Sequence, residues 1–156
     1  MNELQTDWNM VGVKQTVLAD AMGFAQAGLG DDAAAFFEKF QRSGWMKRFE
    51  RSEGRATLGC SGSELVLMIC GSLGRAYQPA DFVDRCNFDT ITSSVEYWIG
   101  YALGYLQGRS CLPFQDIFSR FPIDSWYQMY GLHEVSDDAL WDKTLGRYAP
   151  GTFWGS

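Results

Sequence analysis

Apolar side chains recur every three or four residues along most of the chain, the spacing that places them on one face of a helix. The first such stretch runs from Val13 to Ala27. Nowhere do apolar and polar residues alternate long enough to predict a pair of strands. The pattern therefore predicts an all-α fold of about six to eight helices. The predicted helices cover residues 13–27, 31–43, 45–51, 61–73, 93–107, 113–121, 126–132 and 136–145.

Short polar residues mark where several of these helices begin. Ser61 is followed three residues later by Glu64, and Ser93 by Glu96, which is the spacing of a capping box. In a capping box the serine hydroxyl and the glutamate side chain each accept a backbone N–H of the first turn. One member of the Asp31–Asp32 pair is expected to cap the second helix in a similar way.

The helix predicted over residues 93–107 is rich in aromatic residues. Tyr97, Tyr101 and Tyr105 recur every four residues, and Gly100 and Gly104 lie one turn apart. Such a glycine pair favours membrane dimers only inside an apolar segment of about 20 residues. The apolar segment here has about a dozen residues and starts at a glutamate. We therefore predict that this helix packs tightly at the centre of a water-soluble core.

Length and composition fit one globular domain. The chain has 156 residues, of which 46% are hydrophobic and 15% aromatic, and a chain of this length can bury a core without a disulfide or metal. We expect a single compact helical domain over residues 1–156, with 1–10 and 148–156 as peripheral tails. Pro79 prevents an unbroken helix through residues 75–92, where the pattern indicates no more than one helical turn, at 81–85.

The charge of the chain favours a protein partner over a nucleic acid. The formal net charge is -6 and the pI is about 4.7, so the surface repels phosphate backbones and suits a basic protein. No apolar stretch is long enough to span a membrane, and the first residues lack the basic and apolar regions of a signal peptide. We expect a cytoplasmic protein with free thiols.

No sequence pattern predicts a cofactor or a metal ion. The four cysteines include no C-x-x-C pair, and nucleotide-binding glycine loops are absent. Asp137, Asp138 and Asp142 lack the loop spacing of a calcium site. The stretch Gly59–Ser63 does not match the G-x-S-x-G of a nucleophile elbow, and capping accounts for Ser61.

One set of residues could carry catalysis. His133 is the sole histidine, and a general base near neutral pH is most often a histidine. A small enzyme or ligand-binding protein would use His133, Glu134, Glu96 and Tyr97 around a pocket under the aromatic helix. The alternative for His133 is structural, because a cation at the end of a helix interacts favourably with the helix dipole.

A second set of residues could bind a partner. Arg48 and Arg51 belong to a basic stretch interleaved with aromatic residues, and Trp126 and Tyr130 are of the residue types that dominate interfaces. Because Glu50 and Glu53 lie nearby, the basic stretch is more typical of a salt-bridged helix face than of a nucleic-acid site.

Several motifs spread over residues 36–135 carry a family resemblance. They are Phe37-x-x-Phe40-x-x-Ser43-Gly44-x-x-x-x-Phe49-Glu50, Gly59-x-Ser61-Gly62-x-Glu64-Leu65, Glu96-Tyr97-Trp98-x-Gly100-x-x-Leu103-x-Tyr105-x-Gln107, Phe114-x-x-Ile117 and Met129-Tyr130-x-x-His133-Glu134. In these motifs the chain resembles a family of small helical proteins of gut bacteria, which have no established activity. Genes of that family often lie beside genes for ADP-ribosyltransferase-like proteins, an arrangement similar to a toxin–antitoxin pair. The chain departs from the family at 51–55, where an asparagine–proline pair is usual.

Two hypotheses follow from the sequence. The first is a non-catalytic protein-interaction module, antitoxin-like or immunity-like, that binds the product of a neighbouring gene. The second is the small enzyme or ligand-binding protein built on His133. The second requires His133 to lie within hydrogen-bond reach of Glu96 or Tyr97 in a cavity.

Overall fold

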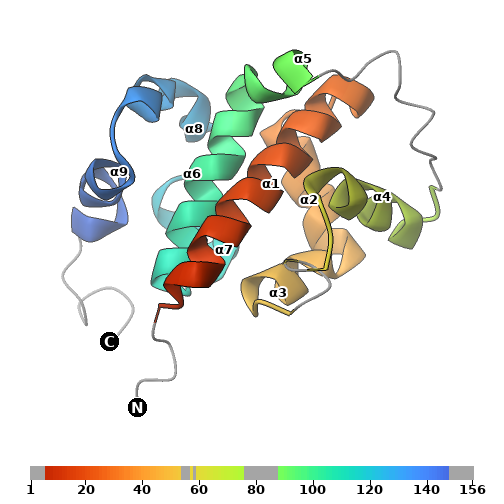
Figure 1. Ribbon diagram of the computed structural model, residues 1–156, viewed down its shortest axis with the longest axis horizontal. Coiled ribbons are helices and arrows are strands. Elements are labelled where there is room, and N and C mark those ends of the chain that lie inside the picture. Colours follow the sequence, from red (N-terminus) through yellow and green to blue (C-terminus); the bar gives the residue numbers. More distant parts are fainter. Residues whose placement is uncertain (1–5, 54–56, 58, 76–87, 148–156) are drawn as a thin grey trace.

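The computed structural model describes residues 6–53, 57, 59–75 and 88–147 (Figure 1). These residues form nine α-helices, two 3₁₀ helices and no strand, which confirms the predicted all-α fold. The helix count exceeds the predicted range by one because the sequence pattern did not predict α5, a short helix within residues 75–92. The α-helices are α1 (Trp8–Leu29), α2 (Ala33–Ser43), α3 (Trp45–Glu50), α4 (Gly62–Ser72), α5 (Phe88–Thr92), α6 (Val95–Ser110), α7 (Phe114–Arg120), α8 (Ser125–Gln128) and α9 (Asp137–Lys143); the 3₁₀ helices are η3 (Tyr130–Glu134) and η4 (Leu145–Arg147).

Helices α1 and α6 lie side by side through the middle of the molecule, with α4 on one side of the pair and α9 on the other (Figure 1). Three glycines of α6 face the backbone of α1. A Cβ atom at Gly100 would lie 2.5 Å from the carbonyl oxygen of Leu18, and one at Gly104 would lie 2.5 Å from that of Lys14. Gly108 similarly faces Val11. These contacts confirm the predicted tight packing of the helix.

A cluster of phenylalanine rings fills the space between α2, α3 and α7. Phe40, Phe49 and Phe114 are fully buried. The centroid of the Phe37 ring lies 5.1 Å from that of Phe114 and 5.0 Å from that of Phe118. Aromatic pairs at such distances add to the free energy gained from burial alone. The cluster therefore fixes α7 against α2, although the two helices are far apart in the sequence.

Two predicted helix caps are confirmed. The Ser61 hydroxyl accepts the Glu64 N–H, and the Glu64 carboxylate accepts the Ser61 N–H at 2.8 Å, which closes a capping box on α4. Asp32 caps α2 by accepting the Ala35 N–H at 2.8 Å. Its neighbour Asp31 instead forms an ion pair with Lys39.

The second predicted capping box is wrong by one residue. Ser94 rather than Ser93 is the N-cap of α6, and its hydroxyl accepts the Tyr97 N–H at 3.1 Å. Tyr97 therefore occupies the third helical position, so Glu96 is one residue too early to close a box. Its carboxylate is directed to another partner, described below.

Other boundaries also differ from the prediction. Helix α1 starts at Trp8, where Asp7 caps it, so part of the predicted tail 1–10 is helical. The predicted helix 126–132 is divided into α8 and η3. The predicted turn at 81–85 and the predicted tail 148–156 lie outside the described residues.

Candidate functional site

The structure divides the predicted catalytic set, because His133 and Glu134 adjoin each other and Glu96 and Tyr97 have other neighbours. His133 is exposed on η3, where its ring stacks on Tyr130 at a centroid distance of 4.1 Å. Its Nδ1 lies 2.6 Å from the Tyr130 carbonyl oxygen, and its Nε2 lies 3.7 Å from the Glu134 carboxylate. Neither Glu96 nor Tyr97 is among its partners. The geometry that the enzyme hypothesis requires is therefore not formed.

Glu96 takes part in a link between helices. The Tyr127 hydroxyl donates to the Glu96 carboxylate at 2.9 Å and accepts the Ala33 N–H at 2.8 Å. This chain of bonds joins the start of α6 to α8 and to the first turn of α2. Burial, reinforced by the bond to Glu96, raises the pKa of Tyr127 to about 12. Tyr97 lies elsewhere, close to Gly23 of α1.

The predicted partner-binding residues differ in exposure. Arg48 is exposed and its guanidinium lies 4.6 Å from the centroid of the Trp45 ring, while Arg51 is exposed beside a pocket. Tyr130 is half-buried between His133 and Trp98. Trp126 is fully buried, so its prediction as a contact residue is wrong. The sequence could not show this, because the residues that cover Trp126 come from other helices.

A surface cluster of aromatic and charged residues surrounds Arg109 at the end of α6. We call it the Arg109 cluster. The Arg109 guanidinium lies 4.2 Å from the Trp141 ring centroid and 5.4 Å from that of Trp8. It donates to the Tyr105 hydroxyl at 2.9 Å and pairs with Asp138 at 3.3 Å. Trp8 is 58% exposed, which makes it the one large hydrophobic residue exposed in the described part of the chain.

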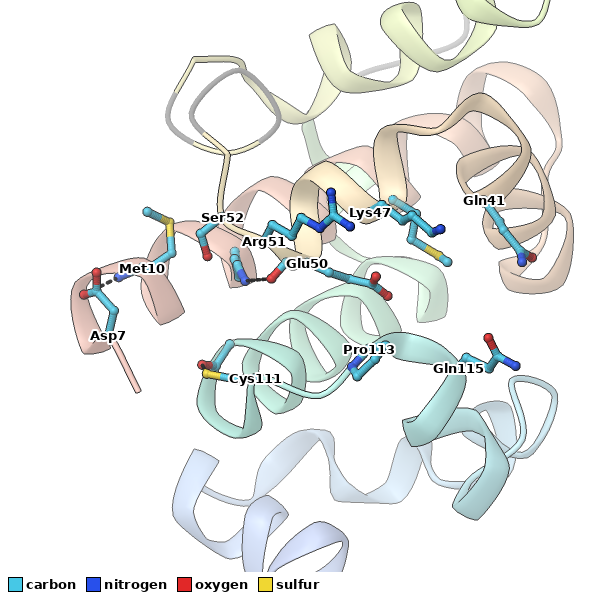
Figure 2. A pocket seen from close by; sticks show the side chains of 13 residues that line it. Asp7, Met10, Gln41, Lys47, Glu50, Arg51, Ser52, Cys111, Pro113 and Gln115 are labelled. Carbon is cyan, nitrogen blue, oxygen red and sulfur yellow. Dashed lines mark hydrogen bonds between the residues drawn. The ribbon is translucent and has the colours of Figure 1, made fainter. Parts of the chain in front are cut away.

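A pocket of about 610 Å³ opens between the start of α1, α3 and the chain that joins α6 to α7. Figure 2 shows Glu50 of α3 and the following Arg51 on one side of it and Cys111 and Pro113 on the other. We call it the Lys14 pocket. It is lined by Asp7, Met10, Lys14, Gln41, Met46, Lys47, Glu50, Arg51, Ser52, Gly108, Cys111, Pro113 and Gln115.

Lys14 is the most unusual residue of this pocket, because it is a charged residue with only 3% of its surface exposed. Its Nζ donates to Oε1 of Gln107 at 2.6 Å and to the carbonyl oxygen of Glu50 at 3.2 Å. Burial lowers the pKa of Lys14 to about 8, although Cys111, Glu50 and Asp7 act in the opposite direction. A titratable residue perturbed by burial in a hollow is typical of functional sites.

The walls of the pocket are held by bonds between distant segments. The Glu50 carboxylate accepts the Phe114 N–H at 2.7 Å and so caps α7 from 64 residues away. Burial raises the pKa of Glu50. Cys111 ends α6 with a φ of 61°, a left-handed conformation that is usually taken by glycine at this position. The pocket is thus built at the junction of three helix ends.

Sequence reasoning missed Lys14 and Gln107. Lys14 lies within the apolar stretch of the first helix, and Gln107 lies at the end of the aromatic helix. The one signal was their polarity at positions that the helical period places toward the core. Polarity alone could not predict the hydrogen bond between Lys14 and Gln107, since the two residues are 93 positions apart in the sequence.

Within the described ranges, no group of three or more His, Cys, Asp or Glu side chains could hold a metal ion. No helix in that part of the chain is long and apolar enough to span a bilayer.

No protein-family model, curated protein or solved structure matches the chain. Function is therefore inferred from the geometry of the molecule itself.

Proposed function

We propose that this protein is a non-catalytic interaction module that binds another protein through the Arg109 cluster. The observation that carries the proposal is the exposure of Trp8 beside Arg109 and Trp141. Tryptophan, tyrosine and arginine are the residue types most enriched among interface hot spots. In this cluster two tryptophans and Arg109 lie near the surface, and the hydroxyl of the buried Tyr105 holds Arg109 from below.

The positions of these side chains are already fixed before a partner arrives. Arg109 is held by Tyr105 and Asp138, and the Thr6 hydroxyl donates to its carbonyl oxygen. Side chains that are ordered in the free protein lose less conformational entropy on binding. The cluster therefore has the preorganisation expected of a binding surface.

The proposed partner is a basic protein, and the product of a neighbouring toxin-like gene is the first one to test. The net charge of -6 favours a basic partner. Asp138, at the rim of the cluster, has 86% of its side chain exposed and can pair with a basic residue. The role would then be antitoxin-like or immunity-like. We also propose that the encounter takes place in the cytoplasm, where a thiol such as that of the buried Cys70 stays reduced.

Co-expression with the folded product of the neighbouring gene, followed by pull-down and measurement of affinity, tests the proposal. We expect a complex with the wild-type chain. Trp8→Ala should weaken it by about 30-fold or more, the loss typical of a hot spot. Arg48→Ala, on a different surface, should change the affinity less than threefold.

Failure of the folded wild-type chain to capture the folded partner would overturn the interaction itself. If Arg48→Ala weakens the complex and Trp8→Ala does not, the interface lies at α3 and not at the Arg109 cluster. We do not advance the enzyme alternative, because His133 is exposed and bonded away from Glu96 and Tyr97.

A further inference from the structure

A second hollow continues from the Lys14 pocket. It is a groove of about 510 Å³ between α2 and α7, and it shares Gln41, Met46 and Gln115 with that pocket. Figure 2 shows Gln41 and Gln115 on opposite sides of the hollow, from α2 and from α7. The two hollows therefore form one path with different chemistry at its two ends.

The first end is cationic. The ammonium group of Lys14 has three N–H groups, and the described residues place acceptors within hydrogen-bond distance of only two. No carboxylate of the described residues forms an ion pair with it. A buried ammonium is stabilised by a partner of opposite charge. Beyond these two bonds, the amine lies 5.5 Å from the centroid of the Phe49 ring. An anionic ligand in the pocket would supply the opposite charge that Lys14 lacks.

The charges around this end indicate how many negative charges such a ligand carries. Lys14, Lys47 and Arg51 line the pocket, and so do the carboxylates of Asp7 and Glu50. Both carboxylates accept backbone N–H groups. Asp7 accepts that of Asn9 in the first turn of α1, and Glu50 accepts that of Phe114 at the start of α7. One positive charge is left in excess. This balance suits a single carboxylate better than a doubly charged phosphate.

The second end is apolar. Phe37 and Phe114 form the floor of the groove, and Phe118 and Ile123 are half-buried at its side. The flexible side chain of Met46 lies where the groove meets the pocket. Flexible methionine adapts to chains of different shape. The groove can therefore cover an unbranched hydrocarbon chain that leads away from the cationic end.

We propose that this path binds a medium-chain fatty acid, with its carboxylate at Lys14 and its hydrocarbon chain along Phe37, Phe118 and Ile123. The inference does not depend on the proposed protein partner, because the two use different residues. The charge complementarity at Lys14 and the apolar lining of the groove are its two independent supports.

Calorimetric titration of the full-length protein with sodium dodecanoate below its micelle concentration tests the proposal. We expect saturable binding of one molecule, and affinity that rises about threefold for each methylene from octanoate to dodecanoate. Dodecyltrimethylammonium, which has the same chain and the opposite charge, should bind at least tenfold more weakly. Equal binding of the two amphiphiles, or no binding of dodecanoate, would overturn the proposal.

Variants at the two ends provide independent readouts. Lys14→Met should weaken dodecanoate binding at least tenfold. Phe118→Ser should do the same, whereas Met68→Ser, a half-buried apolar residue of α4 outside the groove, should change affinity less than threefold. Circular dichroism checks that each variant is folded. If Lys14→Met does not fold, Phe118→Ser and the chain-length series still decide the outcome, and unchanged affinity in Phe118→Ser would contradict the proposal.

The pH dependence of binding gives a further test of the contact with Lys14. The charged groups that face its amine are Asp7 from α1, Glu50 from α3 and Cys111 after α6. Affinity should fall as pH rises through about 8, where the ammonium loses its proton. Cys111→Ser should keep this dependence. Affinity that stays constant from pH 7 to pH 9.5 would contradict a contact between the carboxylate and Lys14.

Discussion

The Nζ atom of Lys14 lies 2.6 Å from Oε1 of Gln107, inside the contact between α1 and α6. Gln107 in turn donates from Nε2 to the carbonyl oxygen of Leu112 at 3.0 Å. Both side chains are buried, although Lys14 also lines the Lys14 pocket. Because burial disfavours the charged form of the amine, the contact makes the stability of the fold depend on pH.

The free energy of unfolding should rise with pH between about 8 and 10.5 because of Lys14. The pKa of Lys14 is about 8 in the folded protein and near 10.5 without burial, so the unfolded state binds more protons in this window. Over this whole pH range, the free energy of unfolding should rise by on the order of 3 kcal/mol. Urea denaturation at several pH values measures it.

Lys14→Met is the reference for this measurement, because other groups also titrate in alkaline solution. Burial raises the pKa of Tyr127, Tyr97, Tyr101 and Tyr105, which lowers stability as pH rises beyond their unfolded values near 10. The difference in stability between wild type and Lys14→Met should therefore change across the window. Parallel pH profiles of the two proteins would show that Lys14 is not the source.

Gly104→Ala should destabilise the protein by about 1–3 kcal/mol, the usual cost of overpacking. Its new Cβ would lie 2.5 Å from the carbonyl oxygen of Lys14, so α1 and α6 would have to separate. Gly12→Ala is the matched control on α1, since no atom lies within 4 Å of its Cβ position. It should stabilise the helix by up to about 1 kcal/mol. Chemical denaturation compares the two, and equal effects would contradict the close packing.

Tyr127→Phe should cost about 1–3 kcal/mol, because it leaves the Ala33 N–H and the Glu96 carboxylate without their shared partner. Tyr130→Phe is the comparison, since the Tyr130 interactions in the structure are ring contacts and a backbone bond. It should change the midpoint of thermal unfolding far less. A loss in Tyr130→Phe as large as in Tyr127→Phe would contradict this assignment.

Trp126→Ala should destabilise the fold by about 3–5 kcal/mol. Trp126 is fully buried, lies against Trp98 and Phe121, and donates from Nε1 to the Phe121 carbonyl oxygen at 3.1 Å. Trp8→Ala should cost about 1 kcal/mol or less, since it removes an exposed ring and one cation–π contact. Thermal unfolding of both variants distinguishes a core residue from a surface residue of the same type.

Local patterns in the sequence predicted most of the helices and several of their ends. The capping box of Ser61 and Glu64, the cap at Asp32 and the break at Gly44 depend on residues close in sequence, so they could be found without a structure. The site depends on contacts between distant segments. The bond from Lys14 to Gln107, and the cap that Glu50 provides to Phe114, join parts of the chain that no local pattern relates. Trp126 shows the same limit, because Trp98 and Phe121, which pack against it, come from other parts of the chain.

The glycine contacts between α1 and α6 also have a consequence for the order of folding. The two helices meet through residues such as Lys14 and Gln107, which are 93 positions apart, so a long loop must close before this contact can form. All-helical proteins usually fold fast because their contacts are local. This chain should fold more slowly than a bundle of sequential hairpins of the same length. On the ribosome, α4 can pack against α1 first, and the face of α1 that receives the α6 glycines stays uncovered until α6 has emerged.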